Sequence, residues 1–296
     1  MLFSVANYRG TFASLIICFS VMDAKAEVET RTGQRLGYSY IGFGSEQVDY
    51  REEDENLLDT GLGLQTAAST TQLFQRSGGY VAHNSGWGFY IQTEATIGNE
   101  ASKETWKING TTVQQNSFTL KRNELRILVS KQVSTSHAFL FGGSLQDLSF
   151  SRFDWVLTNQ DEFQVAISEG SVSEDIFKLF AYAGYEIGEF YLEEKCGWNW
   201  QIQLLAGIPI YSQTLNTSYG ADTINGGFDG YHFELTGSVG YHLSRNFLLG
   251  LSLKNAYEDQ KEIEQKNQKS NGVIKRSLPE NSLTIMQPSV TFYWSF

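Results

Sequence analysis

An alternation of apolar and polar side chains at every second position recurs along this sequence and restricts the folds that it can adopt. It is most regular at residues 228–243, and it recurs at residues 87–98, 198–212 and 247–257. Successive side chains of a β-strand point to opposite faces of a sheet, so each segment predicts a strand with one apolar and one polar face. Aromatic residues make up 14% of the chain and only three prolines interrupt it, which favours an all-β protein.

The segments between the expected strands are alternately short and long. Strands are expected at residues 35–50, 67–82, 87–98, 117–131, 137–153, 176–193, 198–212, 228–243, 247–257 and 283–296. Short turns separate some of them, at residues 83–86, 133–136, 194–197 and 244–246. Long polar connections separate the others, at residues 51–56, 99–116, 154–175, 214–227 and 258–281. Tight turns at one end and long loops at the other are typical of an up-and-down barrel in an outer membrane.

The sequence therefore predicts a single transmembrane antiparallel up-and-down β-barrel of about ten strands. Eight or twelve strands stay open as alternatives, because the alternation is weaker at residues 67–82 and 176–193. In the strand expected at residues 117–131, Phe118 and Leu120 fall on the polar face. This departure from the pattern predicts a β-bulge in the first half of that strand.

The last fourteen residues, Leu283–Phe296, form the expected closing strand. Counting back from the aromatic carboxy-terminus, every second residue on one face is apolar, namely Phe296, Trp294, Phe292 and Val290. This pattern resembles the closing strand of bacterial outer-membrane β-barrel proteins, whereas the edge strand of a soluble sheet is the alternative. The resemblance implies that these four residues guide insertion by the barrel-assembly machinery. It also implies contact with outer-membrane lipid and lipopolysaccharide, two periplasmic termini and extracellular long loops.

Residues 1–26 have the form of a cleaved secretory signal peptide, which leaves residues 27–296 as the barrel. Arg9 precedes a mostly apolar run at residues 11–22, and a small-x-small cleavage sequence ends at Ala26. This run is shorter than the roughly 20 residues of a spanning helix. Cleavage would leave Cys196 as the one thiol, so no intramolecular disulfide and no cysteine metal cluster are expected. The net charge of −11 argues against nucleic acid as a partner.

Ionisable side chains alternate with the apolar residues and are expected to face the lumen. On one strand Arg122, Glu124 and Arg126 form a ladder of alternating sign. The predicted lumen charge network comprises Glu94, Arg122, Glu124, Arg126, His232 and Glu234, and His242 shares the inward parity. A path for ions or substrate is one interpretation of this network. An ionic plug is favoured, because buried charges must be paired.

His232 and Glu234 also suggest a membrane-embedded hydrolase, since a carboxylate that orients a histidine is typical of a general base. Ten strands and this pair resemble the omptin proteases in outline. Omptins, however, use an aspartate pair opposite an Asp-His pair, and Asp229 here has outward parity. The segment 240–246 is similar to the His-x-Ser core of outer-membrane phospholipase and lipid A deacylase. Its His242 and Ser244 are expected beside a periplasmic turn, far from the outer leaflet where such enzymes need their nucleophile.

A group of acidic residues follows the first expected strand: Glu52, Glu53, Asp54, Glu55 and Asp59. Such acids could hold divalent cations against lipopolysaccharide phosphates, but a solvated charge run is favoured. We therefore expect a non-enzymatic barrel without catalytic residues, metal or cofactor. The lumen of this barrel is expected to be narrow or plugged. Its function is expected to be either surface interaction through the outside loops or passage of small solutes through the lumen. A hydrolase using His232 and Glu234 is the alternative.

Overall fold

The computed structural model describes residues 37–54, 62–83, 85–158, 171–189, 197–217, 223–269 and 272–295. The strands are β1 Tyr38–Asp54, β2 Leu64–His83, β3 Trp87–Asn99, β4 Ser102–Ile108, β5 Thr111–Ser134, β6 His137–Leu157, β7 Val172–Glu189, β8 Trp198–Asn216, β9 Thr223–Gly226, β10 Gly230–Ser244, β11 Phe247–Gln260, β12 Ile263–Lys269, β13 Gly272–Leu278 and β14 Glu280–Ser295. Within these ranges, no helix is long and apolar enough to cross a membrane.

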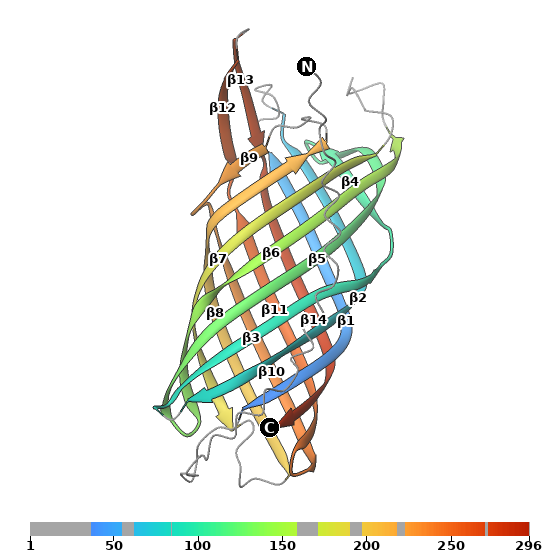
Figure 1. Ribbon diagram of the computed structural model, residues 1–296. Helices are drawn as coiled ribbons and strands as arrows, with labels where there is room; N and C mark the ends of the chain where they lie inside the picture. The colour runs from blue at the N-terminus through green and yellow to red at the C-terminus, as the bar shows by residue number, and fades with distance from the viewer. Residues whose placement is uncertain are drawn as a thin grey trace, which may run out of the picture. The chain divides into compact units, whose positions relative to one another are not determined.

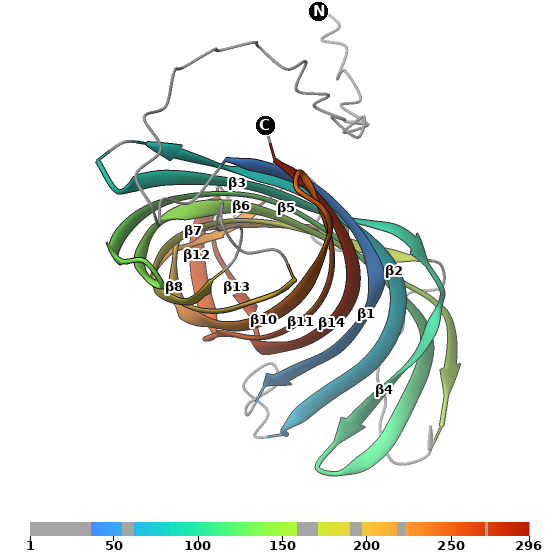
Figure 2. The ribbon, with the colours of Figure 1, turned by 90° about the horizontal axis from the view of Figure 1, so that it is seen from below.

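The long strands form one closed antiparallel ring (Figures 1 and 2). Their order around the ring is β1, β14, β11, β10, β8, β7, β6, β5, β3 and β2, and β2 pairs with β1 to close it. The short strand β4 lies between β2 and β5, as β3 does, and β9 pairs with β8 as β10 does. Ten of the twelve strands of this sheet follow one another around the ring, which confirms the predicted barrel and roughly fits the expected number of about ten strands.

The two ends of the barrel differ in their connections. At one end, called the turn end here, short turns join β2 to β3, β5 to β6 and β10 to β11. The first of these places Gly86 at a φ of 74°, a left-handed conformation that glycine adopts without a steric penalty. At the opposite end, called the mouth, β4 and β5 form one hairpin, and β12 and β13 form another that projects from the barrel (Figure 1).

The strands extend farther toward the mouth than the sequence predicts. Residues 99–116 were expected to form a loop, but they contain β4 and the start of β5, and residues 258–281 contain the β12–β13 hairpin. Arg51–Asp54, which was also expected outside a strand, ends β1. On β4 the outward side chains are polar, namely Lys103, Thr105 and Lys107, so the alternation of apolar and polar residues is missing there. The strands of these segments are stabilised by backbone pairing with neighbours, which leaves little trace in the order of side chains.

An apolar band covers the outer surface of the barrel. Trp198, Leu204, Phe233 and Leu251 are 71%, 53%, 52% and 58% exposed. Soluble monomers rarely expose contiguous apolar patches of more than a few hundred Å², so this surface is suited to a hydrocarbon environment. On β6 and β7 the band ends toward the mouth, where outward positions become polar: Asp147, Ser149, Ser151, Ser173 and Asp175.

The predicted bulge in residues 117–131 is wrong. β5 pairs with β6 without a shift from Ser117 to Gln132, so Phe118 and Leu120 point into the lumen, where both are fully buried. They pack in an apolar layer that crosses the barrel toward the mouth, and its other members are Val48, Tyr50, Ala68, Leu148, Phe150, Ile176, Ala256, Leu283 and Ile285. The inward face is thus apolar at this level because inward residues of neighbouring and opposite strands pack together.

Candidate functional site

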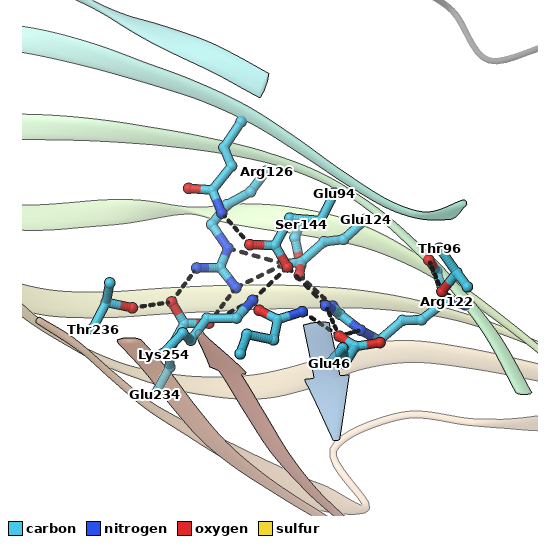
Figure 3. Close-up of polar contacts among 12 residues, drawn as sticks. Glu46, Glu94, Thr96, Arg122, Glu124, Arg126, Ser144, Glu234, Thr236 and Lys254 are labelled. Carbon is cyan, nitrogen blue, oxygen red and sulfur yellow. Dashed lines mark hydrogen bonds and ion pairs between the residues drawn. The ribbon is translucent and has the colours of Figure 1, made fainter. Parts of the chain in front are cut away.

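The predicted ladder on β5 exists and is the centre of a buried ionic network (Figure 3). Arg122, Glu124 and Arg126 alternate along the strand at spacing two, so all three point into the lumen. Glu124 accepts hydrogen bonds from both arginines, at 3.1 Å from Arg122 Nη1 and 2.9 Å from Arg126 Nε. The ladder is therefore internally paired along one strand.

Arg126 also crosses the lumen to Glu234. Its two terminal nitrogens each donate to one carboxylate oxygen of Glu234 at 2.7 Å, which is the bidentate geometry of a strong arginine–carboxylate pair. The guanidinium lies 5.0 Å from the centre of the Tyr182 ring, within range of a cation–π interaction. β5 and β10 are four positions apart in a ring of ten, where five is the maximum, so this pair bridges nearly the full diameter.

Two residues outside the predicted network extend it around the lumen. Arg122 contacts Glu46 on β1 at 2.6 Å and Glu94 on β3 at 2.7 Å. Lys254 on β11 donates to Glu94, which again lies four positions away in the ring, and its Nζ is 3.8 Å from Glu234. The charges therefore form a continuous chain of alternating sign across the lumen (Figure 3).

Neutral side chains also donate hydrogen bonds to the carboxylate of Glu46. Glu46 accepts a hydrogen bond of 2.6 Å from Gln72 and a further one from Gln287, besides its pair with Arg122. Glu46 and Arg126 are 0% and 1% exposed. Charges at this depth are tolerated only where partners compensate for lost hydration, and here each carboxylate has several.

Arg76 on β2 forms a further bridge next to the network. Its Nη2 donates to Ser252 on β11 at 2.6 Å and to Thr291 on β14 at 2.7 Å. Gly42 provides the space for this contact, because a Cβ atom there would lie 2.6 Å from Thr291 Oγ1 and 3.1 Å from Arg76 Nε. The missing side chain on β1 thus allows the guanidinium to pass over β1 and reach β14 and β11.

His232 lies between two carboxylates and is 2% exposed. Its Nε2 is 3.7 Å from Glu234 and its Nδ1 is 3.6 Å from Glu258, which also pairs with Lys178 at 2.5 Å. Each ring nitrogen faces a carboxylate at the distance of an ion pair, and neither nitrogen makes a hydrogen bond with a described residue, so the site fits an imidazolium between two negative charges. A general base instead needs an unprotonated nitrogen that faces the substrate. The geometry thus suits a cross-link between Glu234 and Glu258.

Apolar layers lie on both sides of the ionic network. Toward the mouth lies the layer of Phe118, which includes the inward residues two positions beyond Glu46, Arg122 and Lys254, namely Val48, Leu120 and Ala256. Toward the turn end, two clusters fill the lumen: Tyr38, Tyr40, Tyr80, Leu248 and Tyr293 in one, and Leu128, Leu140, Phe180, Tyr182 and Leu205 in the other. The inward-facing side chains thus alternate between polar and apolar layers along the barrel axis.

A second charge cluster lies at the mouth, beyond the apolar band. Arg152 Nε donates to both oxygens of Glu104 at 3.1 and 3.0 Å, and its Nη2 donates to Glu52 at 3.0 Å. Glu174 accepts a hydrogen bond of 2.6 Å from Asn216. Burial, reinforced by the negative charge of Glu52, raises the pKa of Glu174 to about 7.

The predicted site residues are placed as follows. The six members of the lumen charge network are all buried in the lumen. His242 has inward parity but lies at the turn end, where its backbone N–H donates to Gly197 O, so it is outside the network. Ser244 ends β10 at the same turn. The structure thus keeps this pair away from the mouth.

Other predicted residues differ in outcome. Glu52 was expected in a solvated loop, and this is wrong, because it points into the barrel and pairs with Arg152. Glu53 and Asp54 end β1, while Glu55 and Asp59 lie outside the described residues. Of the closing strand, Val290, Phe292 and Trp294 face outward and are 41%, 38% and 39% exposed, and Phe296 lies outside the described residues. Their role in assembly stays a prediction.

Among the described residues, the sequence interpretation missed nine buried charged ones: Glu46, Arg76, Glu104, Arg152, Glu174, Lys178, Glu186, Lys254 and Glu258. Strand parity could have found Lys254 and Glu258, because they alternate with Leu249, Leu251 and Leu253, which were expected to face outward. Within the ranges that the structure describes, no group of three or more His, Cys, Asp or Glu side chains is placed to hold a metal ion.

Comparison with known proteins identifies the fold. No protein-family model and no curated protein sequence matches the chain. The crystal structure of the outer-membrane protease OmpT from Escherichia coli matches with a TM-score of 0.67 and 10% identity, over 90% of this chain and 99% of that one. The outer-membrane protein OprG from Pseudomonas aeruginosa matches with a TM-score of 0.34 and 12% identity, over 90% and 99%. The first likeness shows that this chain has the fold of a bacterial outer-membrane β-barrel.

Proposed function

We propose that this chain is a non-enzymatic integral outer-membrane protein whose lumen is closed by its own side chains. In this proposal the mouth, with its hairpins and long connections, faces the cell exterior and binds a surface partner. The turn end and both termini face the periplasm, because outer-membrane barrels have short turns on that side.

The observation that carries this proposal is the set of contacts that cross the lumen at successive levels. Arg126 reaches Glu234, and Lys254 reaches Glu94, each pair four strand positions apart. In the apolar layer, the rings of Tyr50 on β1 and Phe150 on β6 are also four positions apart and have their centres 4.8 Å from each other. A ten-strand lumen is little wider than its side chains, so such contacts support the proposal of a closed lumen.

The surroundings of the barrel follow from its outer surface. The apolar band is suited to outer-membrane lipid, with lipopolysaccharide as the lipid partner of the outer leaflet. The outward stripe of Val290, Phe292 and Trp294, continued by Phe296, is the feature that we assign to recognition by the barrel-assembly machinery. These partners stay proposals that depend on insertion in the outer membrane.

Single-channel recording in planar bilayers tests the closed lumen. We expect purified protein to insert without a steady conductance, whereas a general porin in the same bilayers gives open steps. A steady conductance in the range of general porins would contradict the proposal. If the barrel passed only small solutes, liposomes that contain it would swell when small sugars are added. We expect no such swelling.

A membrane-embedded hydrolase is the second candidate, and the likeness to OmpT favours it. In this alternative, His232 and Glu234 act as the catalytic pair. The burial of His232 and its two carboxylate neighbours support the cross-link instead. Incubation with a mixture of synthetic peptides and with lipid A, followed by mass spectrometry, tests the alternative. We expect no cleavage; a cleavage activity that His232→Ala abolishes, while the refolded barrel stays intact, would establish it.

A further inference from the structure

One sector of the outer surface differs from the rest of the apolar band. On β1, β2 and β3 the outward side chains at band level include Ser45, Gln75, Ser77 and Thr93. Ser77 and Thr93 are cross-strand partners whose hydroxyl groups lie 2.8 Å apart. We call the outward face of these three strands the β1–β3 face.

These polar residues lie within the band, as the strand register shows. Gln75 is opposite Phe43 on β1 and Ala95 on β3, and Phe43 is opposite Val290 on β14. Phe43 and Val290 are 45% and 41% exposed and belong to the band. The amide and hydroxyl groups of the β1–β3 face therefore lie at the depth of the membrane that lipid chains would occupy.

The opposite side of the ring carries bulky apolar residues at its outward positions. β8 is five positions from β2, and its outward residues include Trp200, Ile202, Leu204 and Ile208. The β1–β3 face also exposes Phe43, Leu73 and Phe89, but Gly79 at its centre, between Ser39 on β1 and Ile91 on β3, has no side chain. A polar group in hydrocarbon costs free energy unless it is hydrogen-bonded, as the hydroxyl groups of Ser77 and Thr93 are to each other. Ser45 and Gln75 would therefore gain most from a second protein surface, which small residues allow to approach closely.

Charges of both signs lie just beyond the band on the same strand. Asp49 and Arg51 point outward on β1, opposite Thr284 and Ser282 of β14, where the outward surface has become polar. In a two-fold symmetric dimer, a residue i of one copy that contacts residue j of the other copy implies a second, identical contact between residue j of the first copy and residue i of the other. One adjacent acid and base on each copy then form two equivalent ion pairs across the axis.

We propose that the β1–β3 face is the interface of a homodimer in the membrane, with a two-fold axis along the membrane normal. Serine, threonine and glutamine each donate and accept hydrogen bonds, so a surface made of them is complementary to a second copy of itself. Asp49 and Arg51 add charge complementarity of the same two-fold kind. The apolar side of β8, β10 and β11 faces lipid in the dimer.

Cysteine cross-linking tests the position of the interface. The full chain with Cys18→Ser and Cys196→Ser serves as the background, and Ser45→Cys, Gln75→Cys or Ser77→Cys is introduced singly. In membranes treated with an oxidant or a short bismaleimide, we expect a covalent dimer for at least one of them. Leu204→Cys, on the opposite side of the ring, is the control and stays monomeric. Cross-linking of the three that does not exceed that control would overturn the proposal.

A charge swap tests the ion pairs and does not depend on cross-linking. Sedimentation equilibrium in density-matched detergent measures the mass of the folded barrel, and we expect twice the monomer mass for the wild-type chain. Asp49→Arg should raise the dissociation constant about tenfold by opposing like charges, and Asp49→Arg/Arg51→Asp should restore it. Asp259→Arg, outward on β11, should have no effect. A wild-type monomer at all concentrations, or a double variant no better than the single one, would contradict the interface.

Discussion

Replacing Arg126 by methionine should strongly destabilise the barrel. Arg126 donates two hydrogen bonds of 2.7 Å to Glu234 and one of 2.9 Å to Glu124, and it is 1% exposed. Removing one partner of a buried ion pair costs about 3–5 kcal/mol, because the other charge is left without compensation. Glu124 keeps Arg122 and Glu234 keeps Lys254 nearby. We therefore expect a loss of about 4 kcal/mol rather than the sum over both carboxylates.

Urea unfolding of refolded protein in detergent micelles or lipid vesicles, followed by tryptophan fluorescence, measures this loss. Lys121→Met on the same strand is the matched control, since Lys121 points outward and is exposed. Its effect should stay within about 0.5 kcal/mol. The double variant Arg126→Met/Glu234→Gln should recover part of the loss, because it removes the uncompensated carboxylate.

Two results would refute the reasoning about Arg126. A loss below about 1 kcal/mol for Arg126→Met would mean that the pair contributes no more than an exposed ion pair. Strict additivity of Arg126→Met and Glu234→Gln would mean that the two groups are not coupled across the lumen. Either result would remove the main support for a closed ionic plug.

Further predictions concern the mouth, the apolar layer and the closing strand. Burial and the negative charge of Glu52 raise the pKa of Glu174 to about 7. The protonated carboxyl group therefore stabilises the folded barrel fully below the ordinary pKa of 4.5, and this stabilisation is lost as pH rises through 7. Glu174→Gln should remove this pH dependence and stabilise the barrel at pH 8 by up to about 3 kcal/mol. Urea unfolding below pH 4.5 and at pH 8 measures both effects. Phe150→Ala should cost about 3–5 kcal/mol and leave the bilayer conductance closed, because the ionic network persists; open channels would contradict this. Deletion of Phe296 should lower the amount of barrel assembled in cells without changing refolding in detergent, and unchanged assembly in fractionated membranes would refute its role.

Strand parity determined much of this protein from local information. A side chain's face in a strand depends only on its position modulo two, so the expected strands placed Glu94, Arg122, Glu124, Arg126, His232 and Glu234 in the lumen. The short turns could also be predicted from the sequence, because polar and glycine residues separate the alternating segments there. Closure followed from the connection lengths, and the ring of ten positions confirms it.

The tertiary structure alone decided which inward residues meet. Arg126 and Glu234 are 108 residues apart, and they pair because ring closure and stagger bring β5 and β10 to one level of the lumen. Phe118 and Leu120 violated the polar-inside rule for the same reason, since the side chains that cover them come from other strands. Parity is a property of one strand, whereas pairing across a lumen depends on the shear of the whole barrel, which no single stretch of sequence contains.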